Sequence, residues 1–385
     1  MELGSEFHID LTDLSVKDNT IYTLLKSYHT FYTDYGRTAI SLLYEYLQKQ
    51  VRKKFLLPSY ICDSVVEPFP KEVITFYELK ENFVIDEAAL NALIDTDEYD
   101  GGIFYLNHYF GAVQPLDMLG RLQKLCKEHQ ITIIEDTTHS IFTRTRTIGD
   151  YCIASLRKWM PIPEGAVIYS MQELPEDWKA LEHAKPSAKI EAMVLKKLFL
   201  GQNTAYKELM DAEEINEVYR QIFVTEEERI EADKAGQGKA CTISDLSAFL
   251  LQCQDVIKIQ ENRKRNCLFL QEQLAKHGIS LYGQENLTGN SSEILKEETI
   301  PYTALLKLKE HNRNDFRKYL MEHKIYCAVH WPIEIEEQRK YAHVSEWAEQ
   351  LISLPIDQRY NEEEMKYLAE TILAWFAAER TIFTK

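Results

Sequence analysis

Short apolar runs alternate along the first 170 residues with longer segments in which every third or fourth residue is apolar. Runs of aliphatic, β-branched or aromatic residues predict buried strands, whereas the three-and-four spacing predicts helices with one buried face. The predicted strands are 55–57, 73–77, 102–106, 131–134, 152–155 and 166–169. The predicted helices are 39–47, one from about residue 63, 86–95 and 116–129, after a lead-in over about residues 1–30 with one short helix. This alternation is typical of βαβ units around a mostly parallel sheet.

The pattern changes after residue 170. Residues 175–235 are predicted to be helical and charged. A further helix starts at Ser244, and an α+β region follows it. The elements predicted for that region are a long helix over 255–277, strands over 302–308 and 325–329, and helices over 314–323 and 361–378. The chain is therefore expected to form an α/β large domain over residues 1–250 and a smaller α+β domain over residues 251–385.

Composition narrows the class of function. A net charge of −17 argues against binding to nucleic acid or to an anionic membrane, because both would repel the protein. No apolar run is long enough to span a membrane, and the first residues lack the apolar region of a secretory signal, so we expect a cytoplasmic protein. None of the 7 cysteines forms a CxxC pair. We therefore expect buried free thiols and no metal site.

Polar residues follow three of the predicted strands. Ser59 and Tyr60, Asn107 and His108, and Glu135 and Asp136 stand at these strand ends. The carboxyl ends of parallel strands form the edge at which α/β sheets bind ligands. The sequence therefore predicts a ligand site at this edge.

The segment 131–170 holds the residues best suited to chemistry. Lys158 lies in an apolar neighbourhood beside Arg157, two conditions that lower the pKa of a lysine and make its amine a nucleophile. Asp136 follows an apolar strand and needs a cationic partner, for which a protonated pyridine nitrogen is suitable. The alternatives are a solvated lysine and an aspartate that caps the next loop.

Three further positions complete a possible cofactor set. Residues 36–38 precede a predicted helix whose first backbone N–H groups could bind a phosphate, although a plain capped helix explains them as well. Ser155 could bind the phosphate near the lysine, or it is a strand-end serine. His139 follows Asp136 by three residues, and a lone histidine is more often a satisfied surface or core group than a catalyst. Pyridoxal phosphate requires this combination of an anion for its ring nitrogen, donors for its phosphate and a lysine for its aldehyde.

Four segments resemble the DegT/DnrJ/EryC1/StrS family of pyridoxal-phosphate-dependent aminotransferases, which have fold type I. The similarity is clear over about residues 30–170 and weaker from Ser244 to the end. The segments are the phosphate turn GRTAI (36–40), the loop YLNHYFG (105–111), the strand end IIEDTTHS (133–140), and residues 149–165 with Ser155, Lys158 and the Pro-Glu-Gly turn.

The resemblance implies a role for each matched residue. Lys158 is the Schiff-base lysine and proton carrier, Asp136 the partner of the pyridinium nitrogen, and His139 a neighbour of the ring hydroxyl. The phosphate ligands that it implies are Gly36, Arg37, Thr38 and Ser155. Tyr60 is a further candidate cofactor contact, and the candidate substrate contacts are His108, Tyr109 and His330.

The family also implies a homodimer with active sites at the subunit interface. Its members move an amino group from glutamate or glutamine to a keto-sugar or a related keto substrate. Two alternatives are a non-catalytic or regulatory protein with the same fold and a pyridoxal-phosphate-dependent sugar dehydratase, a variant in which histidine typically replaces the lysine.

Three departures from the family pattern stand out. Ser155 and Lys158 are only three residues apart, Cys62 stands where an aromatic residue is expected to stack on the cofactor ring, and residues 242–245 replace an Asn-Tyr-Arg segment that reaches the partner's cofactor. These departures favour a divergent subgroup with a different keto substrate.

Overall fold

A computed structural model of the chain describes residues 1–12, 14–48, 54–143, 147–185, 187–201, 212–232, 240–283, 299–308 and 312–382. Its main sheet has seven strands in the order β1-β7-β6-β5-β4-β2-β3. The strands are β1 (His29–Thr33), β2 (Phe55–Pro58), β3 (Ile74–Tyr77), β4 (Ile103–Asn107), β5 (Thr132–Asp136), β6 (Tyr151–Ser155) and β7 (Ala166–Ser170). β7 runs opposite to the other six strands of this sheet, so the predicted mostly parallel sheet is confirmed.

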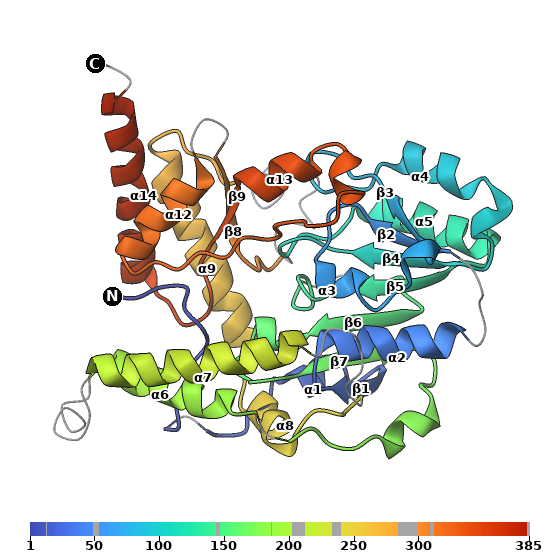
Figure 1. Cartoon of the computed structure of the whole chain (residues 1–385), viewed down its shortest axis with the longest axis horizontal. Helices are drawn as coiled ribbons and strands as arrows, with labels where there is room; N and C mark the ends of the chain where they lie inside the picture. The colour runs from blue at the N-terminus through green and yellow to red at the C-terminus, as the bar shows by residue number, and fades with distance from the viewer. Residues whose placement is uncertain are drawn as a thin grey trace.

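Helices cover both faces of this sheet (Figure 1). Those of the large domain are α1 (Ile21–Leu24), α2 (Gly36–Gln48), α3 (Asp63–Val66), α4 (Glu87–Ile94), α5 (Leu116–Glu128), α6 (Lys189–Gly201), α7 (Ala212–Ala232) and α8 (Asp245–Gln252). On one face α4 and α5 pack against Phe104 and Ile133, and on the other α2 packs against Ile134 and Ile153. Successive strand residues face opposite sides, which is why these continuous apolar strands can be buried on both faces.

The C-terminal part has its own two-stranded sheet and core. The antiparallel strands are β8 (Ala304–Lys307) and β9 (Leu351–Leu354). Its helices are α9 (Val256–Ala275), α12 (Arg313–Glu322), α13 (Val344–Gln350) and α14 (Glu362–Ile382). Figure 1 shows α9 running from beside α12 and α14 toward β6, and Trp331 and Trp347 pack into a core cluster of the large sheet. The predicted boundary between residues 250 and 251 stays a prediction.

Several predicted elements differ from the structure. The strand predicted over 325–329 is wrong, because Ile325 and Ala328 make only isolated bridges, to Leu3 and Ser353 respectively, and β9 pairs with β8 instead. The helix predicted from residue 63 ends after four residues, where Pro68 and Pro70 prevent its continuation. The strands β1 and β9 and the helix α13 were not predicted.

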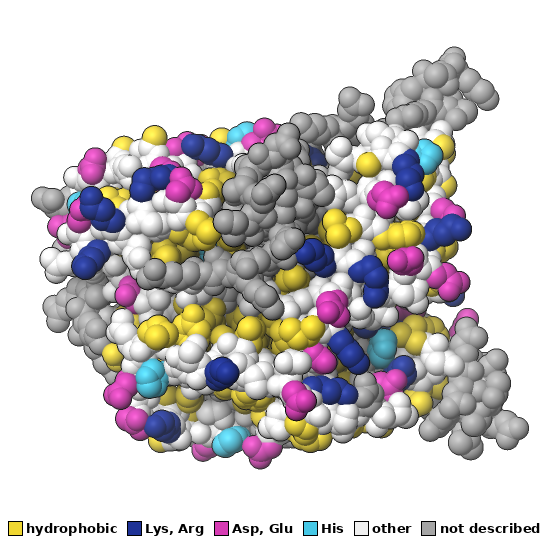
Figure 2. Space-filling model, turned by 180° about the vertical axis from the view of Figure 1, so that it is seen from behind, with side chains coloured by type: hydrophobic (Ala, Val, Ile, Leu, Met, Phe, Trp, Pro, Cys, Tyr) yellow, Lys and Arg dark blue, Asp and Glu magenta, His cyan; other side chains and the backbone are white. Residues whose placement is uncertain are grey.

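The distribution of charged side chains on the surface and the burial of most cysteines are typical of a globular protein. Figure 2 shows acidic and basic side chains interspersed over one face, with hydrophobic side chains gathered in a band across its middle. Five of the seven cysteines are buried and none forms a disulfide. Among the residues that the structure describes, no helix combines the length and apolar character needed to cross a membrane.

Candidate active site

Two cavities meet at Lys158. The strand-end cavity, of about 280 Å³, lies at the carboxyl ends of β4, β5 and β6 and beside the start of α2. The second cavity, of about 420 Å³, lies between the large sheet and the C-terminal part. Arg157, Lys158 and His330 line both cavities. A group on Lys158 can therefore be reached from either side.

Lys158 ends a short 3-10 turn, Leu156–Lys158, that directly follows β6. Its pKa is lowered from the usual value, mainly because burial disfavours the charged amine. Arg157 lowers the pKa further, whereas Cys62 and Asp136 oppose the shift. A larger share of the amine is neutral near neutral pH than in an exposed lysine, and a neutral amine is the form that attacks a carbonyl carbon.

Asp136 is the last residue of β5 and is 6% exposed. Its Oδ2 accepts a hydrogen bond of 2.7 Å from the Tyr105 hydroxyl, and its Oδ1 accepts one of 2.8 Å from the backbone N–H of Thr138. Asp136 lines the strand-end cavity together with Lys158. The two hydrogen bonds hold the carboxylate in one orientation at the cavity wall, where it can bind a cationic ring nitrogen.

His139 lies between aromatic rings on the same cavity. Its ring stacks on Tyr302 with centroids 4.3 Å apart, and the backbone N–H of Phe110 donates a long hydrogen bond of 3.5 Å to Nδ1. The pKa of His139 is well below its usual value, chiefly through burial, so the ring is neutral. If Nδ1 accepts, the proton is on Nε2, and Nε2 is buried with no partner. This N–H is thus available to a ligand oxygen.

The first turn of α2 lies against Ser155. A Cβ atom added to Gly36 would lie 3.4 Å from the Ser155 Cβ, which is an ordinary van der Waals contact, so Gly36 and Ser155 are direct neighbours. Gly36, Arg37 and Ser155 all line the strand-end cavity. The first N–H groups of a helix have no partner within the helix and carry partial positive charge, which suits a phosphate.

Side chains near this turn are engaged elsewhere. The Arg37 guanidinium pairs with Glu67 at 3.2 Å, and the Thr38 hydroxyl bonds the carboxyl of Asp34. Burial raises the pKa of Asp34 to about 6, and the nearby Glu164 adds to the shift. Thr38 is not among the residues that line the cavity. The backbone of the first turn and the Ser155 hydroxyl are therefore the groups left to bind an anion.

Three predicted contacts are turned away from both cavities. The buried Tyr60 hydroxyl bonds the backbone carbonyl of His330 and accepts from the backbone N–H of Trp331 at 3.0 Å. The Tyr109 hydroxyl donates to the Tyr60 carbonyl at 2.7 Å, and His108 Nε2 lies 2.9 Å from Glu135 Oε1. The structure brings His330 to the site but not Tyr60, His108 or Tyr109.

Other residues that line the strand-end cavity were missing from the predicted set. Tyr35, Thr138, Trp331 and Cys62 contribute to its wall. Cys62 had a sequence signal, because it stands four residues after Pro58 at the end of β2. Trp331 had none, since it comes from the C-terminal part and reaches the cavity only through the fold. Among the described residues, no group of three or more His, Cys, Asp or Glu side chains is arranged to hold a metal ion.

Glu135, the residue before Asp136, has a structural position rather than one in the cavity. It is fully buried, and its Oε2 accepts hydrogen bonds from the backbone N–H groups of Ile148 and Gly149 at 2.6 and 2.7 Å. Glu135→Ala should lower the free energy of unfolding by about 3 kcal/mol, because it leaves these groups and His108 without partners. Urea denaturation measures this. The exposed Glu128→Gln is the control, with an expected change below about 1 kcal/mol. Equal effects would contradict the role of Glu135.

The buried His139 and the half-buried His8 and His330 predict a loss of stability in acid. Burial lowers the pKa of His8 to about 4 and of His330 to about 3, and that of His139 is also well below 6.5. Between pH 6.5 and 4 the unfolded chain binds these protons and the folded chain does not, so stability is complete above pH 6.5 and falls with the pH. The raised pKa of Asp34 has the opposite effect on stability as the pH falls, but it is one group against three histidines.

The slope can be measured with one variant. In His8→Gln the free energy of unfolding should fall less steeply between pH 6 and 5, by about 1.4 kcal/mol per pH unit. Chemical denaturation at each pH gives this number. His183→Gln, at an exposed histidine, should keep the wild-type slope. An unchanged slope in His8→Gln would show that the His8 imidazole does not control acid stability.

Comparisons with known proteins agree on one family. The model of the DegT/DnrJ/EryC1/StrS aminotransferase family matches residues 211–373. A search of the curated proteins found no match. The predicted family resemblance is confirmed, but the family model matches the C-terminal half, where the similarity was expected to be weak. The segments quoted between residues 36 and 165 lie outside the match, so the roles implied for them stay predictions.

Solved structures with the same fold cover the whole chain. Spr1654 from Streptococcus pneumoniae, in its apo form, has a TM-score of 0.67 at 14% identity, and all of both chains is covered. PseC from Helicobacter pylori, an aminotransferase of pseudoaminic acid biosynthesis, has a TM-score of 0.61 at 15% identity, with 98% of this chain and 100% of that chain covered. A DegT DnrJ EryC1 StrS aminotransferase from Brucella abortus has a TM-score of 0.60 at 13% identity, with 92% and 88% covered. At such identities the likeness establishes the fold, and the predicted fold type I architecture is confirmed.

Proposed function

We propose that this chain, which belongs to the DegT/DnrJ/EryC1/StrS aminotransferase family, is a pyridoxal-phosphate-dependent aminotransferase. It would move an amino group from an amino acid, glutamate or glutamine, to a keto-sugar or a related keto substrate. The observation that carries the proposal is one cavity lined by the amine of Lys158, the carboxylate of Asp136 and the first turn of α2. Those three groups match the aldehyde, the ring nitrogen and the phosphate of the cofactor.

The residues present fit this cofactor. The N–H at His139 Nε2 is buried with no partner, as expected of a group that waits for the hydroxyl of a bound ring. The start of α2 lies beside Ser155, which brings backbone N–H groups and a hydroxyl together for a phosphate. Cys62 offers a smaller surface to the ring than an aromatic side chain, so that face of the cavity is less filled.

Asp136, Lys158 and His139 would have different tasks in this reaction. When bound, pyridoxal phosphate supplies an electron-withdrawing ring that stabilises negative charge at the substrate carbon bearing the amino group. Asp136 keeps the ring nitrogen protonated through its negative charge. Lys158 would hold the cofactor through its aldehyde, and its amine would carry a proton to and from the substrate carbon. His139 would donate its Nε2–H to the ring hydroxyl.

The proposed enzyme is a homodimer that acts on small molecules in the cytoplasm. Exposed apolar surface supports the proposed dimer, because a band of hydrophobic side chains crosses the face shown in Figure 2. Leu24 of α1 and Phe249 of α8 are exposed apolar residues. Their two helices are in contact, because the Tyr22 hydroxyl of α1 donates a hydrogen bond to the Ala248 carbonyl of α8. Apolar patches of this kind are typical of subunit contacts. Light scattering at several concentrations tests the proposed dimer.

A spectroscopic titration tests the chemistry. Wild-type protein mixed with pyridoxal phosphate should gain a visible absorption band, and borohydride should then attach the cofactor covalently to Lys158, which peptide mapping locates. Addition of glutamate before borohydride should remove the band and prevent the labelling. A protein that gains no band would contradict the proposal. A band that persists with every amino donor would favour the non-catalytic alternative, whereas a dehydratase would consume a keto-sugar without an amino donor.

A further inference from the structure

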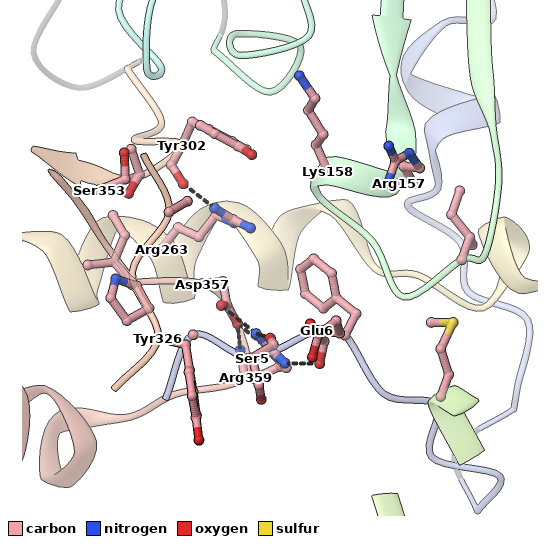
Figure 3. Close-up of a pocket in the computed structure, with 18 of the residues that line it drawn as sticks. Ser5, Glu6, Arg157, Lys158, Arg263, Tyr302, Tyr326, Ser353, Asp357 and Arg359 are labelled. Atoms are coloured by element: carbon pink, nitrogen blue, oxygen red, sulfur yellow. Dashed lines mark hydrogen bonds and ion pairs between the residues drawn. The ribbon is translucent and has the colours of Figure 1, made fainter. Parts of the chain in front are cut away.

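The second cavity contains a buried arginine that the proposed chemistry has not used. Arg263 comes from α9, is 2% exposed, and lines the cavity with Lys158 and Tyr302. Figure 3 shows its guanidinium end reaching into the cavity, with Tyr302 beside it and Lys158 across from it. Arginine is almost never fully buried unless a negative charge compensates it. The partners of this side chain are therefore informative.

Neutral groups hold Arg263 in one orientation. Its Nε donates a hydrogen bond of 2.9 Å to Gln358 Oε1, and its Nη1 donates one of 2.6 Å to the Tyr302 carbonyl. The guanidinium carbon lies 4.4 Å from the ring centre of Trp159, and Gln358 is itself fixed by donating to the Trp159 carbonyl at 2.6 Å. One hydrogen of Nη1 and both hydrogens of Nη2 remain. The edge of the guanidinium formed by Nη1 and Nη2 is thus oriented in advance and available.

The charge of Arg263 has no direct counter-charge among the described residues. Asp357, a carboxylate that acts on Arg263 through its charge, is hydrogen-bonded to Arg359 instead, with Oδ1–Nε at 2.7 Å and Oδ2–Nη2 at 2.9 Å. Another cation of the cavity wall, Lys189, is paired with Glu227. Burial lowers the pKa of Arg263 to about 10, so it remains protonated at neutral pH. Arg263 therefore brings to the cavity a positive charge that no direct ion pair among the described residues neutralises.

A planar carboxylate is the ligand that fits this edge best. Two parallel N–H groups of a guanidinium match the two oxygens of a carboxylate, and such charge-assisted pairs are strongest where water is excluded. Lys158, on the other side of the cavity, is the proposed reaction centre. A molecule with its amino or keto carbon at Lys158 and its carboxylate at Arg263 is an amino acid or the corresponding keto acid.

We propose that Arg263 is the specificity-determining residue that binds the carboxylate of the amino donor in the second cavity. The inference rests on the proposed aminotransferase function for the identity of the donor. The built carboxylate site itself does not require the cofactor. Binding to the cofactor-free protein can therefore be measured separately from turnover.

The first experiment titrates cofactor-free protein with glutarate at constant ionic strength, by calorimetry. Wild-type protein should bind glutarate, dimethyl glutarate should not bind, and Arg263→Gln should weaken glutarate binding at least about tenfold. Arg263→Lys should recover only part of the affinity, because a lysine cannot make the parallel pair of bonds. Glutarate binding that is equal in wild type and Arg263→Gln would overturn the proposal. So would inorganic phosphate that binds more tightly than glutarate at the same edge.

A second experiment needs no variant, in case Arg263→Gln does not fold. Phenylglyoxal modifies accessible guanidinium groups, and mass spectrometry measures the extent at Arg263. Glutarate should slow this modification at Arg263 but not at Arg121, which is exposed on α5. Equal rates with and without glutarate would contradict the proposal.

Kinetics separate the two proposals. In enzyme loaded with cofactor, Arg263→Gln should raise the KM for glutamate at least about tenfold while the absorption band and the KM for the keto acceptor stay as in wild type. If Arg263→Gln keeps the absorption band and its KM for glutamate is unchanged, the role of Arg263 is wrong, but the proposed aminotransferase function stands. If glutarate binds at Arg263 but wild-type protein gains no absorption band with pyridoxal phosphate, the carboxylate site is supported and the proposed aminotransferase function is wrong.

Discussion

Replacement of Lys158 by alanine is expected to lower the turnover of amino transfer at least about a thousandfold while the protein stays folded. The side chain supplies both the amine that attaches to the cofactor and the base that moves the proton, so its loss removes two steps at once. Its lowered pKa shows that burial disfavours its charge, and removing it should not lower stability greatly. Turnover is measured with glutamate as donor, and circular dichroism checks the fold.

Two controls sharpen this result. Lys179→Ala, at an exposed lysine paired only with Glu176, should keep wild-type turnover. Methylamine added to Lys158→Ala should restore part of the activity, because a free amine can replace the missing base but not the covalent attachment. A Lys158→Ala protein that keeps a tenth or more of the turnover would rule out this lysine as the reaction centre.

Asp136→Asn is expected to lower turnover about a hundredfold or more, with little change in stability. Asparagine keeps the size of the side chain and can still bond Tyr105 and the N–H of Thr138, which now hold Asp136 at 2.7 and 2.8 Å. What it removes is the negative charge that keeps a ring nitrogen protonated. The loss should therefore appear in turnover and in the position of the absorption band.

The matched control for this variant is Asp117→Asn, at an exposed aspartate of α5 that pairs with Arg121. That variant should have wild-type turnover and an unshifted band. If Asp136→Asn behaves like Asp117→Asn, the ring nitrogen does not bind at Asp136, and the orientation proposed for the cofactor is wrong.

The order of strands and helices in the large domain could be predicted because hydrophobic periodicity is a local property. β5 and β6 end close to the predicted positions, and this brings Asp136 and Ser155 to one edge of the sheet. The start of α2 lies beside Ser155 at this edge. Short elements were harder to predict from the sequence. β9 is only four residues long, and the segment around Ile325 is apolar but makes isolated bridges instead of a strand ladder.

Side-chain direction could not be predicted in the same way. Tyr60, His108 and Tyr109 follow strand ends as Asp136 does, but their polar atoms bond the backbone or Glu135 behind the cavity. A strand end fixes where a residue lies and not which partner its side chain finds. Thr38 is a similar case, since its hydroxyl turns to Asp34.

By itself the sequence determined the α/β class, the mostly parallel sheet, and the placement of Asp136, Ser155 and Lys158 at neighbouring strand ends, because each depends on spacing within a short segment. Only the tertiary structure decided which residues meet across the two cavities. Trp331 and Arg263 come from distant parts of the chain, and Arg263 acquires its importance from burial among neutral partners. Burial and the absence of a counter-charge at Arg263 among the described residues arise from packing between segments far apart, which no local pattern encodes.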